Sequence, residues 1–307
     1  MKMKKHIACL CLPLLVGLAA CSKGDKVESV EEKRAIVNQV AEGVTKSLGK
    51  SDFVFDLSFK VDGEVTLPDG KITLDDFELQ AQGEFDFPET LEKGSDIANI
   101  KAHLGIETDG DIEFVKEGAT THVDCDSKIC DFFFEEGTFY ADIYKSNFSE
   151  FLVGQVLNGA LELPLKSKLN LSELIDPNSV IDLQKDFETP EIDDALLNAI
   201  NLYVASDEYT FEIDSSEVNI KDDAGVERNV KDFLGVDIEA SLVIDKEFRL
   251  TDFEVEGTLD IAKLDEGKKA SGKLDFDFDL NVNYKANPEV KSVSNKEEYK
   301  QFKLFSK

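Results

Sequence analysis

The chain has 307 residues, with 34 Lys and Arg against 64 Asp and Glu, so its formal net charge at pH 7 is −30. It contains 22 Phe and no Trp. A chain this acidic repels the phosphates of nucleic acids, which excludes nucleic-acid binding as a function, and its field favours cations or basic partners.

Residues 1–20 have the composition of an export signal. Three lysines (Lys2, Lys4 and Lys5) precede an apolar run that ends in small residues. This order is typical of a signal peptide that is removed from the mature protein. The run is too short for a membrane-spanning helix, which needs about 20 apolar residues. We therefore expect cleavage after residue 20.

The signal closes with Leu18-Ala19-Ala20-Cys21, which resembles the lipobox of bacterial lipoproteins. The resemblance implies cleavage before Cys21 and attachment of lipid to its sulfur. Residues 22–28 are mostly polar or small, so we expect residues 21–28 to form a lipidated tether between the lipid and the fold. The protein is then expected in the bacterial cell envelope, anchored by its lipid outside the cytoplasm, either at the outer membrane or on the outer face of the cell membrane.

Residues 29–48 are predicted to form an amphipathic helix. Ser29 and Glu32 have the spacing of a capping box at a helix start, and Val37, Val44 and Leu48 fall on one apolar stripe. Apolar and polar residues then alternate over 53–67, as in a strand with one buried face. A turn at 68–70 precedes a return strand, whose alternation slips at 75–76 and predicts a β-bulge.

Further strands are predicted after residue 97. One runs over 98–106 to a turn at Asp109-Gly110, and segments 120–125, 129–134 and 138–144 are predicted to form a three-stranded meander. A turn at Ser127-Lys128 would place Cys125 and Cys130 opposite each other on paired strands, within reach of a disulfide. Export to an oxidising compartment agrees with that bond. Two free thiols and a metal-binding pair remain the alternatives.

The middle of the chain favours helices. Asn147 and Glu150 have capping-box spacing before a helix near 147–158, and Thr189-Pro190 precedes a helix near 190–204. Long alternating strands return after residue 208, the clearest over 270–284. Residues 291–307 are charged and are predicted to be a frayed tail or a short helix.

These elements predict a mainly β protein of the α+β class. Strands that are apolar on one side only must close their apolar face against themselves or against helices. We expect a single domain over 29–290, a large curved antiparallel sheet or half-barrel. It would wrap around the N-terminal helix and the mid-chain helical insertion, with its acids on the convex side.

The order of elements is similar to that of the mycobacterial LppX and LprG lipoproteins and of the Lol-type carriers. An N-terminal helix, long strands that include 138–144, a helical interruption and more long strands carry the resemblance. It implies a hydrophobic cavity between sheet and helices that holds lipid or another hydrophobic ligand. The alternatives are a filled core, or an envelope protein that presents its acidic sheet face to a partner or to cations.

No catalytic or metal-binding pattern emerges from the sequence. His103 and His122 both lie on predicted strands, and no nucleophile elbow, phosphate loop or zinc signature is present. The segment 109–113 begins like a calcium loop, but Phe114 occupies the position of the turn glycine. The sequence therefore predicts a non-enzymatic protein without a cofactor or metal.

Overall fold

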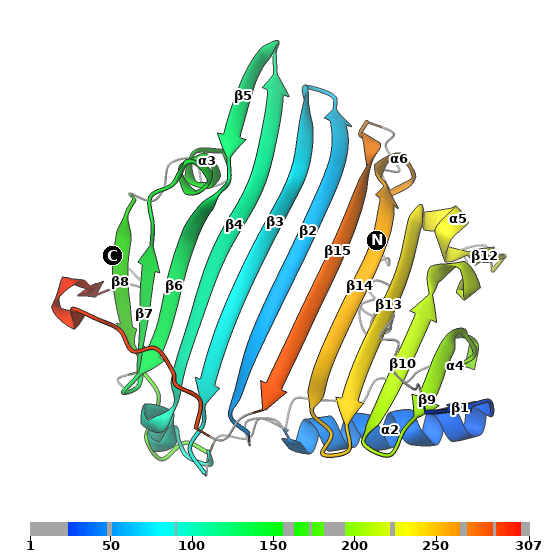
Figure 1. The fold of residues 1–307 in the computed structure, drawn as a ribbon, viewed down its shortest axis with the longest axis horizontal. Helices are drawn as coiled ribbons and strands as arrows, with labels where there is room; N and C mark the ends of the chain where they lie inside the picture. The colour runs from blue at the N-terminus through cyan, green and yellow to red at the C-terminus, as the bar shows by residue number, and fades with distance from the viewer. Residues whose placement is uncertain are drawn as a thin grey trace.

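The computed structural model describes residues 24–47, 51–89, 91–155, 163–171, 174–180, 194–221, 225–264, 269–284 and 287–301. Within them one large sheet has the strand order β1-β9-β10-β13-β14-β15-β2-β3-β4-β6-β7-β8-β16, with β5 also paired to β4. Neighbouring strands are antiparallel, except that β16 is parallel to β8. The predicted α+β class with a large curved sheet is confirmed (Figure 1).

The strands of this sheet are β1 (Asp25–Val27), β2 (Phe53–Leu67), β3 (Gly70–Asp86), β4 (Lys101–Lys116), β5 (Ala119–Asp124), β6 (Ser127–Glu135), β7 (Thr138–Ile143), β8 (Leu165–Asn170), β9 (Ile200–Val204), β10 (Glu208–Asp214), β13 (Val236–Asp245), β14 (Leu250–Asp260), β15 (Ser271–Tyr284) and β16 (Lys300–Gln301). A separate ribbon pairs β11 (Asn219–Lys221) with β12 (Glu227–Asn229). The helices are α2 (Val30–Ser47), α3 (Asn147–Gln155), α4 (Asp194–Ala199), α5 (Val230–Leu234) and α6 (Ile261–Leu264), with 3-10 turns η1 (Gly94–Asn99), η3 (Ser215–Glu217) and η4 (Lys296–Glu298).

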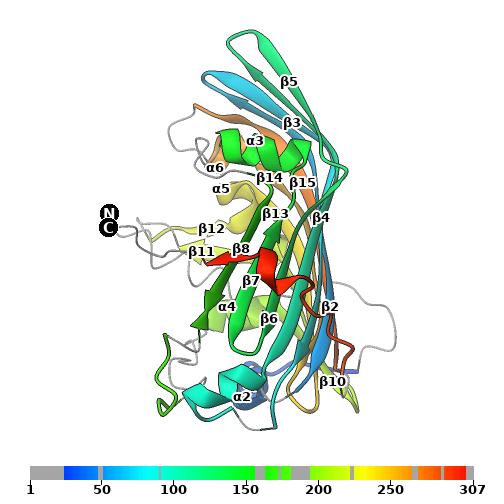
Figure 2. The same cartoon turned by 90° about the vertical axis from the view of Figure 1, so that its left-hand side faces the viewer.

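The sheet is bent, and its helices lie on the concave side (Figure 2). We call this side the inner face and the convex side the outer face. The strand register places the apolar residues of neighbouring strands on the same face of the sheet, because directly paired residues point to the same face. Phe53 of β2, for example, pairs with Phe85 on one side and Tyr284 on the other. Apolar side chains therefore collect on the inner face and acids on the outer face.

Helix α2 lies where the apolar stripe predicts it and covers one end of the inner face. Its Val40 packs with Leu202, Phe211 and Ala240 in the main buried cluster. The helix also buries Lys33, whose Nζ donates to the carbonyl oxygens of Leu197 (3.1 Å) and Ile200 (2.6 Å). This contact satisfies carbonyls at the end of α4, where a helix has no internal donors.

Strand β4 continues through Asp109-Gly110, so the turn predicted there is wrong. Gly110 adopts φ +91° and Asp76 on β3 adopts φ +48°, and the β3–β4 register shifts between Asp75 and Glu78. This irregularity agrees with the bulge predicted at 75–76. The reversal instead comes at Glu117-Gly118, both at positive φ.

The predicted hairpin between the two cysteines is also wrong. Strands β5 and β6 do not pair with each other, because both run along the same edge of β4. The amide of Cys125 donates to Gly110 O at 2.9 Å, whereas Cys130 pairs with Ile106. Four residues along a strand span about 13 Å, beyond the reach of a disulfide. Both thiols are free and buried.

Three other segments differ from expectation. The helix predicted near 190–204 ends at Ala199, and β9 follows because Ile200 and Leu202 alternate into the core against Ile213 and Phe211. The tether predicted over 21–28 contains β1, which pairs with β9. The charged segment predicted to fray is packed over 291–301, where Val293 and Tyr299 are buried.

Candidate ligand-binding face

The inner face is closed by helices at two places. Helix α2 packs over β1, β9, β10 and β13. Helix α3 packs near the far ends of β3, β4 and β5, where Phe148 lies with Ile112, Val123 and Cys125. The two helices lie at opposite ends of the long strands (Figures 1 and 2).

Between these helices the central strands carry a broad apolar patch, which we call the central patch. Its side chains share one property: each is only half-buried, although each faces the concave side. They are Leu57, Phe59, Leu79, Leu104, Ile106, Phe132, Phe278 and Leu280. Phe139, stacked on Phe132 at 5.6 Å between ring centroids, is 36% exposed. Side chains of a filled core are usually fully buried, so apolar side chains that stay partly accessible together form a candidate surface for an apolar partner.

One end of the inner face is built almost entirely of aromatic rings, which we call the aromatic end. Phe53 stacks on Phe85 at 4.7 Å and lies 5.9 Å from Tyr284, and Phe85 stacks on Phe87 at 6.1 Å. The guanidinium of Arg249, in the β13–β14 turn region, lies 4.7 Å from the Tyr284 ring. Burial is the main cause that raises the pKa of Tyr284, so its hydroxyl is neutral at physiological pH.

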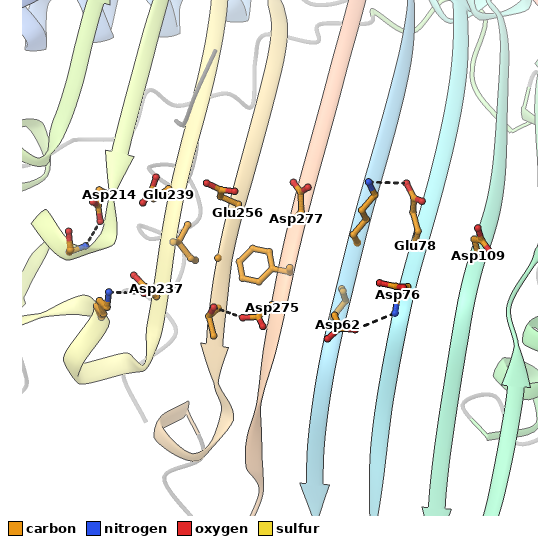
Figure 3. A pocket seen from close by; sticks show the side chains of 18 residues that line it. Asp62, Asp76, Glu78, Asp109, Asp214, Asp237, Glu239, Glu256, Asp275 and Asp277 are labelled. Carbon is orange, nitrogen blue, oxygen red and sulfur yellow. Dashed lines mark hydrogen bonds and ion pairs between the residues drawn. The ribbon is translucent and has the colours of Figure 1, made fainter. Parts of the chain in front are cut away.

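The outer face of β10 to β4 carries an acidic groove of about 780 Å³ (Figure 3). One cross-strand row runs through it, formed by Asp214, Glu239, Glu256, Asp277, Lys60, Glu78 and Asp109. Lys60 and Lys231 are the cations in its lining. In the part of the chain that the structure describes, no group of three or more His, Cys, Asp or Glu side chains could hold a metal ion.

Two further carboxylates of β14, Asp252 and Glu254, have raised pKa values because of burial and crowding. Partial burial, followed by repulsion from Asp252 and Asp279, raises the pKa of Glu254 to about 7. Burial and Asp279 also raise the pKa of Asp252. These groups hold a proton more tightly than a free carboxylic acid, because burial and neighbouring like charges both disfavour the ionised form.

Further along the same outer face, the carboxylate of Asp131 on β6 is almost completely buried but fully partnered. It accepts hydrogen bonds from Tyr144 Oη at 2.6 Å and His103 Nε2 at 2.8 Å, and Lys128 Nζ lies at 3.0 Å. Burial alone would raise the pKa of Asp131, but these donors outweigh burial and hold that pKa well below its usual range. The other His103 nitrogen, Nδ1, lies 3.1 Å from Glu84 Oε2.

Residues 291–301 cross this part of the outer face, and we call them the strap. Lys291 Nζ lies 3.4 Å from Asp131 Oδ1, and the Lys291 amide donates to Glu84 Oε2. Lys296 pairs with Glu135 at 2.6 Å, and the Tyr299 ring meets the Tyr140 ring edge-on at 5.3 Å. Strap and sheet are thus joined by both ion pairs and aromatic packing.

The predicted site residues are only partly within the described residues. Cys21, predicted to carry lipid, and the signal at 1–20 lie outside them. Cys125 and Cys130 lie on the same edge of β4, and burial raises the pKa of each thiol to about 11. The Asp131 cluster and the strap are not predictable from spacing, since their members come from β3, β4, β6 and the C-terminal segment. No described helix is long and apolar enough to cross a membrane.

No family model matches the sequence, and no curated protein matches it either. Among solved structures, LprF from Mycobacterium bovis is similar to this chain at a TM-score of 0.24 and 10% sequence identity, over 84% of this chain and 97% of LprF. A likeness this low assigns neither ligand nor function to the chain.

Proposed function

We propose that this protein is a non-enzymatic lipoprotein of the bacterial envelope that binds a lipid or another hydrophobic ligand on its inner face. It is held to a membrane by lipid on Cys21. The observation that carries the proposal is the half-buried central patch, which offers apolar side chains from eight positions without a charged group among them.

Burying this patch against an apolar ligand is favourable. Each side chain of this size gains about 1.5–3 kcal/mol when it passes from full exposure to full burial. The central side chains are already half-buried, so ligand binding gains only the part of this free energy that corresponds to the area still exposed. The patch also lies on a concave surface (Figure 2), which can contact a ligand from more than one side.

The outer face has a different role in this proposal. Its many carboxylates keep that surface hydrated, and they repel the anionic headgroups of the membrane to which the protein is tethered. An apolar ligand therefore binds more favourably to the inner face than to the outer face. For the same reason the outer face does not lie against the bilayer.

Native mass spectrometry of the full-length protein, purified from its own membrane in mild detergent, tests the proposal. We expect a bound hydrophobic molecule in addition to the acyl chains on Cys21, and binding of a fluorescent fatty-acid probe. Phe59→Asp, on the inner face, should weaken probe binding at least tenfold, whereas Ser58→Asp, on the outer face, should leave it unchanged. Circular dichroism establishes that both variants are folded. Folded wild-type protein that neither retains lipid nor binds the probe contradicts the proposal.

A further inference from the structure

The chain enters the fold at a defined end of the sheet. Strand β1 is paired with β9 in the register Asp25↔Val204. Just before it, Gly24 lies so close to Val204 and Ala205 that a Cβ atom there would overlap their backbone. Gly24 and β1 are therefore fixed against the turn between β9 and β10.

The β9–β10 turn and the aromatic end of the inner face lie at the same end of the sheet. The amide of Lys246, in the β13–β14 turn, donates to Asp207 O at 3.0 Å and joins the two turns. Arg249 follows in the second turn and lies over Tyr284, whose ring contacts Phe53. All these elements lie at the lower end of the sheet in Figure 1.

We infer that this end, formed by the β9–β10 and β13–β14 turns and the aromatic end, faces the membrane that holds Cys21. The inference rests on the lipid anchor of the proposed function. Because Gly24 is already held against the β9–β10 turn, at most residues 21–23 separate this turn from the lipid on Cys21, and three residues span at most about 11 Å. A spacer this short holds the β9–β10 turn next to the bilayer headgroups.

The chemistry of this end suits a bilayer interface. Tyrosine rings are favoured where apolar and hydrated layers meet, and the charge of Arg249 is balanced by Asp245 and Glu247 in the same turn. The opposite end of the sheet carries the β4–β5 turn at Glu117-Gly118, where both residues are exposed. Strand β4 has 16 residues, so the two ends are separated by about 50 Å. The aromatic end of the inner face thus lies toward the membrane.

Site-directed labelling tests the orientation. A spin label is attached at Ser206→Cys, in the β9–β10 turn, or at Glu117→Cys, in the β4–β5 turn, of the acylated protein in phosphatidylglycerol–phosphatidylcholine vesicles that carry a nickel-chelating lipid. The native Cys125 and Cys130 are buried, so the unsubstituted protein is the labelling blank. We expect headgroup nickel to relax the label at position 206 at least fivefold more strongly than the label at position 117.

A second variant isolates the spacer. Insertion of about 20 Gly and Ser residues between Lys23 and Gly24 should reduce this preference at least twofold, because such a linker has an average reach of about 25 Å. Equal relaxation at both positions without the insertion, or a preference that the insertion leaves undiminished, overturns the inference. Mass spectrometry of the same sample reports acylation of Cys21. An unacylated Cys21 overturns both the anchor and the orientation, whereas acylation with equal relaxation overturns the orientation alone.

Discussion

Carboxylates occur in two contrasting settings on the outer face of this sheet. Across β10 to β4 they form rows with few cations, and the pKa of Glu254 is raised to about 7. On β6 they are buried and surrounded by donors, and the pKa of Asp131 is lowered. A carboxylate thus opposes folding at Glu254 and supports it at Asp131, because the surroundings of Asp131 supply donors and cations for the charge.

The largest expected effect comes from breaking the paired region. Asp131→Asn leaves His103, Lys128 and Lys291 without their buried counter-charge, and removing one partner of a buried ion pair costs about 3–5 kcal/mol. We expect a loss of stability of this size in urea unfolding at pH 7. Glu256→Gln, the same chemical change in the acidic row, is the matched control and should be neutral or stabilising.

The pH dependence of Asp131→Asn follows from the same contacts. Since the folded state lowers the pKa of Asp131, this carboxylate contributes stability above its unfolded pKa of about 4 and loses it as the pH falls toward the folded value. The difference between wild type and variant should therefore shrink below pH 4. A difference that stays constant down to pH 2 would contradict the paired role of Asp131.

The next effect comes from detaching the strap. Tyr299 is 4% exposed and packs on Tyr140, so Tyr299→Ala removes a buried aromatic ring, a change that costs about 3–5 kcal/mol in a rigid core. Because the strap can separate without unfolding the sheet, we expect a global loss below that range. Limited proteolysis should instead cut the strap at least tenfold faster. Phe233→Ala, at a residue that is 41% exposed, is the control, and equal cleavage rates would argue against a packed strap.

A smaller effect of opposite sign is expected in the acidic region. The folded pKa of Glu254, about 7, lies above its unfolded value of about 4.3, so its destabilising contribution appears as the pH rises through this interval. Glu254→Gln should raise Tm by a few degrees at pH 8, about 1 kcal/mol after allowance for solvent screening, and by nothing at pH 4. Calorimetry at the two pH values checks this. A gain that is equal at both would mean that charge is not its cause.

The smallest effect concerns the single lysine within the acidic row. Lys60 Nζ lies 4.0 Å from Glu78 Oε1, and the lysine of this pair is exposed to solvent while the glutamate is half-buried. Ion pairs at the surface contribute about 0–1 kcal/mol. Lys60→Gln should therefore destabilise the protein by about 0.5 kcal/mol at low salt and by less at 0.5 M salt, as measured by chemical unfolding. A loss that grows with salt concentration would show that packing of the lysine stem, and not its charge, is responsible.

The strands and the two-sided sheet were predictable from the sequence, because alternation is a local property. Apolar and polar residues alternate over 53–67, and the structure forms β2 over Phe53–Leu67. Alternation and helical periodicity overlap over short spans, however. Ile200 and Val204 fit one helical face as well as one strand face, and only pairing with β10 and β1 selects the strand.

The contacts that define the paired region were beyond the reach of sequence reasoning. The turn-like residues Ser127-Lys128 suggest a hairpin between Cys125 and Cys130. Strands β5 and β6 nevertheless both pair with β4, and this choice depends on a strand that is distant in the sequence. The strap has a weak apolar pattern, because only Val293 and Tyr299 are buried in it. The half-burial of the central patch is likewise a property of curvature and helix placement, which local patterns do not contain.

The strand order also bears on self-association. The path across the sheet begins with β1 and ends with β16, two short segments of three and two residues. Exposed edge strands template the addition of further chains, and covering them is how sheet proteins remain monodisperse. Loss of the strap would uncover β8, whose carbonyls and amides could then recruit a second molecule. The strap thus limits polymerisation of a sheet this wide.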